Sequence, residues 1–257
     1  EAGRLWPLLK FPQDHSVVLD ADAGILAVED CVRQSLEMAR QFGAETAFGE
    51  CVTGWGPTAD GVTVTTDMAT RSAAAVIVTA GAWTGSLFSG LWPALEVRHK
   101  LQLWHTVQPT LTSRLAEMPA FYFELPQGAF YGMPSGASEV KLARHTGGAV
   151  VEDPAEPGNA AVVHEYQPCL QFAADCLHGI SAIPVRTKGC LYTMSPDGHF
   201  ILDRHPESER IVCAAGLSGH GFKFASVIGS VLADLATSGH TEHPVEFLSA
   251  RRFARND

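Results

Sequence analysis

Near the end of the chain the sequence reads Ile211-Val-Cys-Ala-Ala-Gly216-Leu-Ser-Gly219-His220-Gly221-Phe222-Lys223-Phe224. Its apolar first part predicts a buried strand, and its glycines predict a turn. Beyond the turn, apolar residues recur at helical spacing up to Gly239, the expected end of a helix: Phe224, Val227, Ile228, Val231, Leu232 and Leu235. The order of strand, turn and helix indicates an α/β fold.

The turn in this stretch has the chemistry of an anion site. Three glycines allow the backbone to approach a ligand closely, and the start of the helix offers unpaired N–H groups and a positive dipole end. Because Lys223 is unfavourable at that end, we expect an anion to compensate it. An ordinary turn with a solvated lysine remains the alternative. A nucleotide P-loop is excluded, since Phe222 stands where that motif requires lysine.

The composition is that of a globular protein. The chain has 257 residues, of which 46% are hydrophobic and 18% charged, which argues against disorder. A net charge of −10 makes nucleic acid and anionic membrane surfaces poor partners. The longest apolar run, Ala73–Ala82, is about half the length that spans a bilayer, and no charged-then-apolar signal segment opens the chain.

The six cysteines form no C-x-x-C pair, so we expect reduced thiols and a cytoplasmic location. His240 and His243 are the residues that most suggest a metal ligand pair. They lie in a polar C-terminal segment, where histidines are usually solvated, so we expect no metal.

The first and last parts of the chain have an α/β texture. Residues 1–24 are expected to be irregular or edge-like, and Val28–Phe42 is expected to be a helix. Strands are predicted at Ala44–Trp55, Val62–Thr66 and Ala73–Thr79, the last buried on both faces of a parallel sheet, followed by a short helix through Leu91. This succession is typical of one half of a dinucleotide-binding domain.

The middle of the chain predicts an antiparallel sheet: Val97–Val107, Ala120–Glu124, Ala129–Met133 and Val140–His145 read as strands, and His164–His178 as a helix. We therefore expect an α/β chain, α+β overall, with a substrate-type domain inserted into a nucleotide-type domain. Its expected parts are residues 1–24 (an edge segment of the substrate domain), 25–92 (nucleotide-type), 93–185 (substrate-type) and 186–257 (nucleotide-type). No G-x-G-x-x-G follows any strand, so either the cofactor domain is incomplete or the dinucleotide interpretation is wrong.

Three segments occur in a specific order and spacing. They are Tyr131-Gly-Met-Pro-Ser with Val140-Lys141-Leu-Ala-Arg-His145, then Lys188-Gly-Cys190-Leu-Tyr192-Thr with Pro196-Asp-Gly-His199-Phe-Ile-Leu-Asp203, and the Gly216–Phe224 turn. Together they resemble the monomeric sarcosine oxidase and N-methyltryptophan oxidase family of FAD-dependent amine oxidases. The resemblance covers about residues 4–253 and implies that the phosphate-binding glycines belong to an N-terminal segment preceding Glu1.

The resemblance implies an incomplete Rossmann-like FAD domain and a covalent FAD. Cys190 matches the cysteine that forms a thioether with the flavin 8α-carbon, and Lys188 is a cation that could support its reactivity. A buried structural thiol is the alternative. The other residues expected to bind the cofactor are Val52, Gly81, Trp83, Gly219, His220, Gly221 and Phe222.

The resemblance also assigns the substrate and oxygen sites. Lys223 matches the lysine that binds the substrate carboxylate, and Lys141 the lysine that activates dioxygen. Tyr131, His145 and Tyr192 match residues around the substrate amine. The alternatives are a solvated strand lysine for Lys141 and satisfied core residues for the tyrosines and the histidine.

The implied function is oxidation of a secondary N-methyl amino acid such as sarcosine to an imine, with O2 reduced to hydrogen peroxide. Two alternatives stay open. The chain is a catalytically incompetent fragment or a non-enzymatic binding domain, or it is a dehydrogenase that passes electrons to another acceptor.

Overall fold

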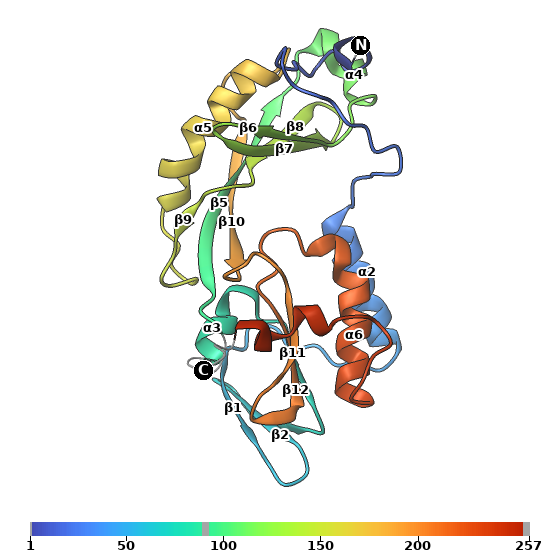
Figure 1. Cartoon of the computed structure of the whole chain (residues 1–257), viewed down its shortest axis with the longest axis vertical. Helices are drawn as coiled ribbons and strands as arrows, with labels where there is room; N and C mark the ends of the chain where they lie inside the picture. The colour runs from blue at the N-terminus through green and yellow to red at the C-terminus, as the bar shows by residue number, and fades with distance from the viewer. Residues whose placement is uncertain (1, 89–92, 254–257) are drawn as a thin grey trace. The chain divides into compact units, whose positions relative to one another are not determined.

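The computed structural model describes residues 2–88 and 93–253. The chain divides into two compact units, one of Glu1–Ile25 and Arg98–Leu191, the other of Leu26–Val97 and Tyr192–Asp257. Both units combine helices with sheets, which confirms the predicted mixed fold (Figure 1).

The first unit is built on an antiparallel sheet, as predicted. Its strands run in the order β10-β5-β8-β7-β6, with the short β9 paired to β5. Their bounds are β5 Glu96–Thr106, β6 Phe121–Leu125, β7 Gly128–Ser135, β8 Glu139–Arg144, β9 Ala149–Val150 and β10 Arg186–Met194. The helix α5, Ala160–Cys176, confirms the predicted helix in this region and lies along one side of the sheet in Figure 1.

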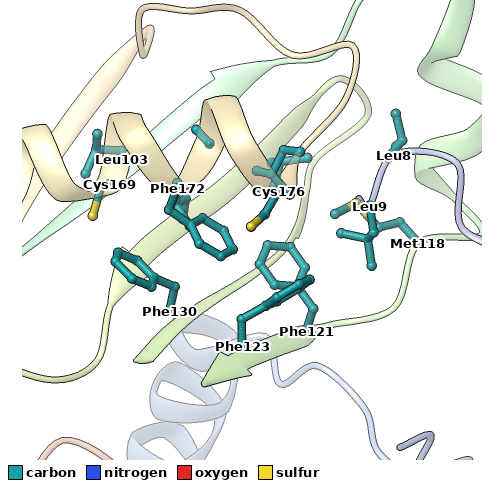
Figure 2. Close-up of a cluster of buried hydrophobic side chains, with 14 of the residues drawn as sticks. Leu8, Leu9, Leu103, Met118, Phe121, Phe123, Phe130, Cys169, Phe172 and Cys176 are labelled. Carbon is teal, nitrogen blue, oxygen red and sulfur yellow. The ribbon is translucent and has the colours of Figure 1, made fainter. Parts of the chain in front are cut away.

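The core of this unit lies between the sheet and α5. Phe172 of α5 stacks on Phe130 of β7, with ring centroids 4.6 Å apart, and also contacts Phe121 and Phe123 of β6 (Figure 2). The N-terminal residues Leu8 and Leu9 are buried in the same cluster. The remaining elements of the unit are short: α1 Ala2–Leu5, the 3-10 turn η2 Pro109–Leu111 and α4 Thr112–Leu115.

The second unit contains the strand-turn-helix of the Ile211–Phe224 stretch, as predicted. β12 (Ser208–Ala215) pairs antiparallel with β11 (Ile201–His205) and parallel with β4 (Val76–Val78). The helix α6, Ala225–Thr237, buries Ile228, Val231 and Leu232 against this sheet. It stops just before Gly239, whose φ of +82° suits glycine and confirms the predicted end. Lys223 lies in the 3-10 turn η3, Phe222–Phe224, rather than in the first α-helical turn.

Two strand predictions in this unit need correction. The strand expected over Ala44–Trp55 begins only at Val52: β1 (Val52–Pro57) pairs with β2 (Val62–Thr66). The pairing ends there because the chain turns after Thr66, whose N–H group donates to the Ala69 carbonyl oxygen at 2.8 Å. The strand expected over Ala73–Thr79 is only β4. It is parallel as predicted, but Ile77 is 43% exposed, so the predicted burial on both faces is wrong.

The second unit also contains further helices, one further strand and short 3-10 turns. α2, Val28–Gln41, confirms the predicted helix, and β3, Thr70–Ala73, pairs with β2. The turn after β4 forms η1 (Gly81–Trp83) and α3 (Thr84–Leu87), so the predicted helix extends through Leu87, and Leu91 lies outside the described residues. Two 3-10 turns, η4 Glu246–Leu248 and η5 Ala250–Phe253, follow α6.

Candidate functional site

One face of the antiparallel sheet carries two of the predicted site residues, Tyr131 and Lys141. Tyr131 of β7 lies opposite Ala143 of β8, which in turn lies opposite Gln102 of β5. Lys141 lies opposite Trp104 in the neighbouring row. Directly opposed residues in antiparallel strands share a face, so these side chains all project from one side of the sheet.

This face is the one turned away from α5. Phe130, Leu103 and Leu142 pack in the core cluster with Phe172 of α5. Each of these three residues is adjacent in sequence to one of the residues on the face described above. Because successive side chains of a strand point to opposite sides of the sheet, that face points away from α5. We call the face that carries Gln102, Trp104, Tyr131 and Lys141 the open face of the sheet.

His145 joins Tyr131 on the open face, together with a tyrosine that the sequence did not suggest. The His145 ring meets the rings of Tyr131 and Tyr122 edge-on, with centroids 6.4 Å and 6.0 Å apart. Tyr122 of β6 lies directly opposite Tyr131. Burial and the nearby Glu124 raise the pKa of Tyr122 above its usual value, which keeps the phenol protonated. The result is an aromatic cluster with one imidazole.

Lys141 is held over an aromatic ring. Its Nζ atom lies 5.4 Å from the centroid of Trp104, within the range of a cation–π contact. The Trp104 Nε1–H group donates to Ser135 Oγ at 3.1 Å, and the Arg186 guanidinium carbon lies 4.0 Å from the ring centroid. Lys141 is half-buried in this setting.

Cys190 of β10 is half-buried and meets the open face through Gln102, whose Nε2 atom lies 3.6 Å from the cysteine Sγ. Burial raises the pKa of this thiol, while the charges of Lys141 and Lys100 and the Gln102 hydrogen bond act in the opposite direction. The sequence suggested Lys188 as the supporting cation. Lys188 is exposed, and the cations that lower the thiol pKa are Lys141 and Lys100.

The remaining predicted residues belong to the second unit, at the carboxyl edge of its parallel strand pair. Cys213 of β12 pairs with Val78 of β4, and Gly216 and Gly81 each follow three residues later. Two glycine turns therefore leave the sheet at the same edge, where α/β sheets commonly bind ligands. The predicted Trp83 lies in the first of these turns, and Val52 at the start of β1; both are exposed.

The turn after β12 depends on its glycines. Gly219 has a φ of +81°, and a Cβ atom there would overlap the ring of Tyr192. Ser218 also has a positive φ, 47°, and its N–H group donates to the Thr193 carbonyl oxygen at 2.9 Å. A Cβ atom on Gly221 would lie 2.7 Å from Leu217. The predicted Tyr192 is thus buried beside the predicted Gly219.

His220, Phe222 and Lys223 are exposed at the end of this turn. The His220 Nδ1–H group donates to the Ser218 carbonyl oxygen at 3.0 Å, because a carbonyl oxygen can only accept. The ring also packs on Phe200, with centroids 4.8 Å apart. His220 and Lys223 both line a largely apolar groove of about 430 Å³ beside α6.

Two classes of site find no support among the described residues. No cluster of three or more His, Cys, Asp and Glu side chains in residues 2–88 and 93–253 could hold a metal ion. None of the helices in those residues has the length and apolar character needed to cross a membrane.

Curated relatives match almost the whole chain. It is 32% identical over 257 residues to the monomeric sarcosine oxidase of Bacillus sp. (strain B-0618), covering 98% of this chain and 66% of that protein. It is 33% identical over 233 residues to the N-methyl-L-tryptophan oxidase of Salmonella dublin, covering 90% of this chain and 62% of that protein. The chain therefore spans slightly less than two thirds of the length of these relatives.

Solved structures share the fold. NikD, an amino acid oxidase of nikkomycin biosynthesis, superposes with a TM-score of 0.73 at 24% identity, over 86% of this chain and 59% of that one. The L-proline dehydrogenase of P. horikoshii gives a TM-score of 0.72 at 19% identity, over 98% of this chain and 66% of that one. The family model of FAD dependent oxidoreductases matches residues 1–235, and the chain belongs to that family.

Proposed function

We propose that this chain forms part of an FAD-dependent oxidase that converts a secondary N-methyl amino acid, such as sarcosine, to an imine while O2 is reduced to hydrogen peroxide. The observation that carries the proposal is the open face, where Tyr131, Lys141 and His145 lie on the same side of one sheet as the Cys190 thiol. Relatives named sarcosine oxidase and N-methyl-L-tryptophan oxidase support this class of substrate.

The residues present fit a flavin. The open face offers a thiol near two cations and beside an amide donor, a setting that favours the nucleophilic thiolate a covalent link would need. In the second unit Gly81 has a φ of +55°, and a Cβ position with no atom within 4 Å, so backbone is accessible there. Cys190 would hold the flavin covalently, and the other contacts would come from Val52, Gly81, Trp83, Gly219, His220, Gly221 and Phe222. When bound, FAD accepts two electrons from the amine and passes them to O2.

The chain's own charges orient the substrate. Lys223, exposed at the turn before α6, would bind the substrate carboxylate, which also compensates the lysine at the positive end of that helix. Tyr131, His145 and Tyr192 would surround the amine. The His145 imidazole, which meets two phenol rings edge-on, would accept a proton from the amine and so favour the unprotonated form that oxidation needs.

Lys141 would serve the oxygen half of the reaction. Its ammonium lies over the Trp104 ring, and an aromatic face attracts a cation without cancelling its charge. A fixed positive charge in a partly desolvated site lowers the energy of the negative charge that forms on oxygen during electron transfer. An acceptor other than O2 is the competing proposal, and replacing Lys141 with methionine tests it through the rate of flavin reoxidation.

Cys190 would hold the flavin through a thioether to its 8α-carbon. Forming this bond would remove the S–H proton of the thiol and one C–H hydrogen of the flavin carbon, and the two protons and two electrons released would reduce one O2 to one hydrogen peroxide. We also propose a cytoplasmic location, which the six free thiols support.

The decisive experiment combines the visible spectrum with denaturing electrophoresis. We expect the purified protein, supplied with FAD, to show flavin absorption bands and to release peroxide with sarcosine. In-gel flavin fluorescence should persist in the wild type and in the control Cys51→Ala, and vanish in Cys190→Ala. A folded but colourless protein would favour the non-enzymatic binding domain. Flavin that dissociates from the wild type on denaturation would refute the covalent assignment.

A further inference from the structure

We infer that Gln102 and Trp104 of β5 are positioning residues, which hold the Cys190 thiol and the Lys141 ammonium at fixed points on the open face. The inference rests on the proposed function, because it assigns a role to residues that support the two reactive side chains. Neither residue was suggested by the sequence.

The geometry of β5 is the first argument. β5 lies between β10, which carries Cys190, and β8, which carries Lys141. Gln102 and Trp104 are two residues apart, so they project from the same face, about 7 Å from each other along the strand. Each contacts a reactive side chain of a different neighbour: Gln102 that of β10 and Trp104 that of β8. One strand therefore sets the spacing between the thiol and the cation.

Gln102 supplies a donor to the thiol. Its amide Nε2 lies 3.6 Å from Cys190 Sγ, and it is half-buried on the open face. An N–H donor directed at sulfur stabilises the thiolate, the nucleophilic form, and limits the directions in which the sulfur can point. Burial works against the thiolate here, so this donor matters more than it would in water.

Trp104 supplies a rigid surface for the ammonium. Its side chain is only 6% exposed, and its ring is fixed by the hydrogen bond to Ser135 and by the Arg186 guanidinium. Arg186 in turn bonds Glu139 through its Nη2 atom at 3.0 Å. An aromatic face attracts a cation through its quadrupole without neutralising it, as a carboxylate would. The contact thus fixes the position of the Lys141 ammonium on the open face.

The test of Gln102 uses the flavin-free protein. Iodoacetamide labelling of Cys190, read by mass spectrometry against the exposed Cys51, measures the thiolate fraction as a function of pH. We expect Gln102→Met, which keeps the length but removes the donor, to slow labelling near neutral pH by about threefold to tenfold. Gln102→Glu should slow it further, because a carboxylate repels the thiolate. Equal labelling in all three proteins would overturn the role of Gln102.

Labelling of the Cys190 thiol does not require flavin, so the role of Gln102 and the proposed function can fail independently of each other. If the wild type never links flavin but Gln102→Met still slows labelling, the support of the thiol stands and the covalent proposal fails. If the wild type links flavin and Gln102→Met does so at the same rate, the inference fails and the proposed function stands.

The test of Trp104 compares Trp104→Phe, which keeps an aromatic face, with Trp104→Leu, which does not. We expect Trp104→Leu to raise the acetylation rate of Lys141 relative to Lys10, and to slow flavin reoxidation by O2 by about threefold to thirtyfold. Reduction by substrate should stay within about twofold, and Trp104→Phe should largely retain the wild-type reoxidation rate. Equal losses in both half-reactions, or equal behaviour of Phe and Leu, would show a merely structural role.

Discussion

The two parts of the candidate site are positioned by different means. On the open face of the antiparallel sheet, strand register places the side chains, since Tyr131, Gln102, Lys141 and Trp104 fall into two cross-strand rows. In the turn after β12, the backbone is placed first, by residues with positive φ such as Gly219. A side-chain change on the open face should therefore alter chemistry, whereas a side-chain addition in the turn should alter the fold.

The largest expected effect concerns the buried ion pair that joins the antiparallel sheet to α5. Lys100 of β5 and Glu165 of α5 form an ion pair of 2.6 Å whose side chains are 1% and 0% exposed. Burial lowers the pKa of Lys100, and the bond to Glu165 opposes that change. Lys100→Met leaves the Glu165 charge buried without its partner, so we expect a loss of about 3–5 kcal/mol in the free energy of unfolding. Urea denaturation measures it.

The control is the double variant Lys100→Met with Glu165→Leu. Replacing both partners of a buried ion pair by apolar residues is often neutral or stabilising, so the double variant should recover most of the lost stability. If it is as unstable as Lys100→Met alone, the packing of the lysine stem rather than the charge pair supports the sheet.

The next effect tests the turn. In Gly219→Ala the added Cβ atom overlaps the Tyr192 ring and the residue keeps a positive φ, so we expect a loss of about 2–4 kcal/mol in unfolding free energy. Gly229→Ala is the matched control, because Gly229 lies inside α6 with no atom within 4 Å of its Cβ position. That control should be neutral or more stable by up to about 1 kcal/mol. Equal effects of the two changes would contradict a backbone-determined turn.

The difference between placement by strand register and placement by local backbone conformation also explains which features the sequence could predict. Local patterns were enough for the strand-turn-helix around β12 and for the antiparallel strands, because alternation and glycine act over a few residues. The contacts of Gln102 and Trp104 were not accessible, since they depend on which strands are neighbours and in what register. Tyr122 was within reach: the two-residue turn Pro126-Gln127 sets it opposite Tyr131. The start of β1 was missed because its pairing with β2 stops where the chain turns after Thr66 toward β3.

The smallest expected effect concerns a turn of the second unit in which a side chain holds the backbone in place. Asp197, in the turn between β10 and β11, accepts hydrogen bonds from Arg252 Nε at 2.8 Å and from the His199 N–H group at 3.0 Å. Arg252 holds the pKa of this carboxyl well below its usual value of 3.8. A depressed pKa means that the stabilisation is present above about pH 4 and is lost as pH falls toward the folded-state pKa.

Asp197→Asn should therefore cost about 1 kcal/mol of unfolding free energy at neutral pH, since the partly exposed pair is screened by solvent. The difference from wild type should shrink in urea titrations carried out progressively below about pH 4, where the unfolded wild-type chain binds a proton that the folded carboxyl does not. Asp30→Asn is the control: the Arg33–Asp30 pair is 70% and 62% exposed, so its loss should cost less than about 0.5 kcal/mol. A difference for Asp197→Asn that does not change with pH would mean that shape and hydrogen bonding, rather than charge, hold this turn.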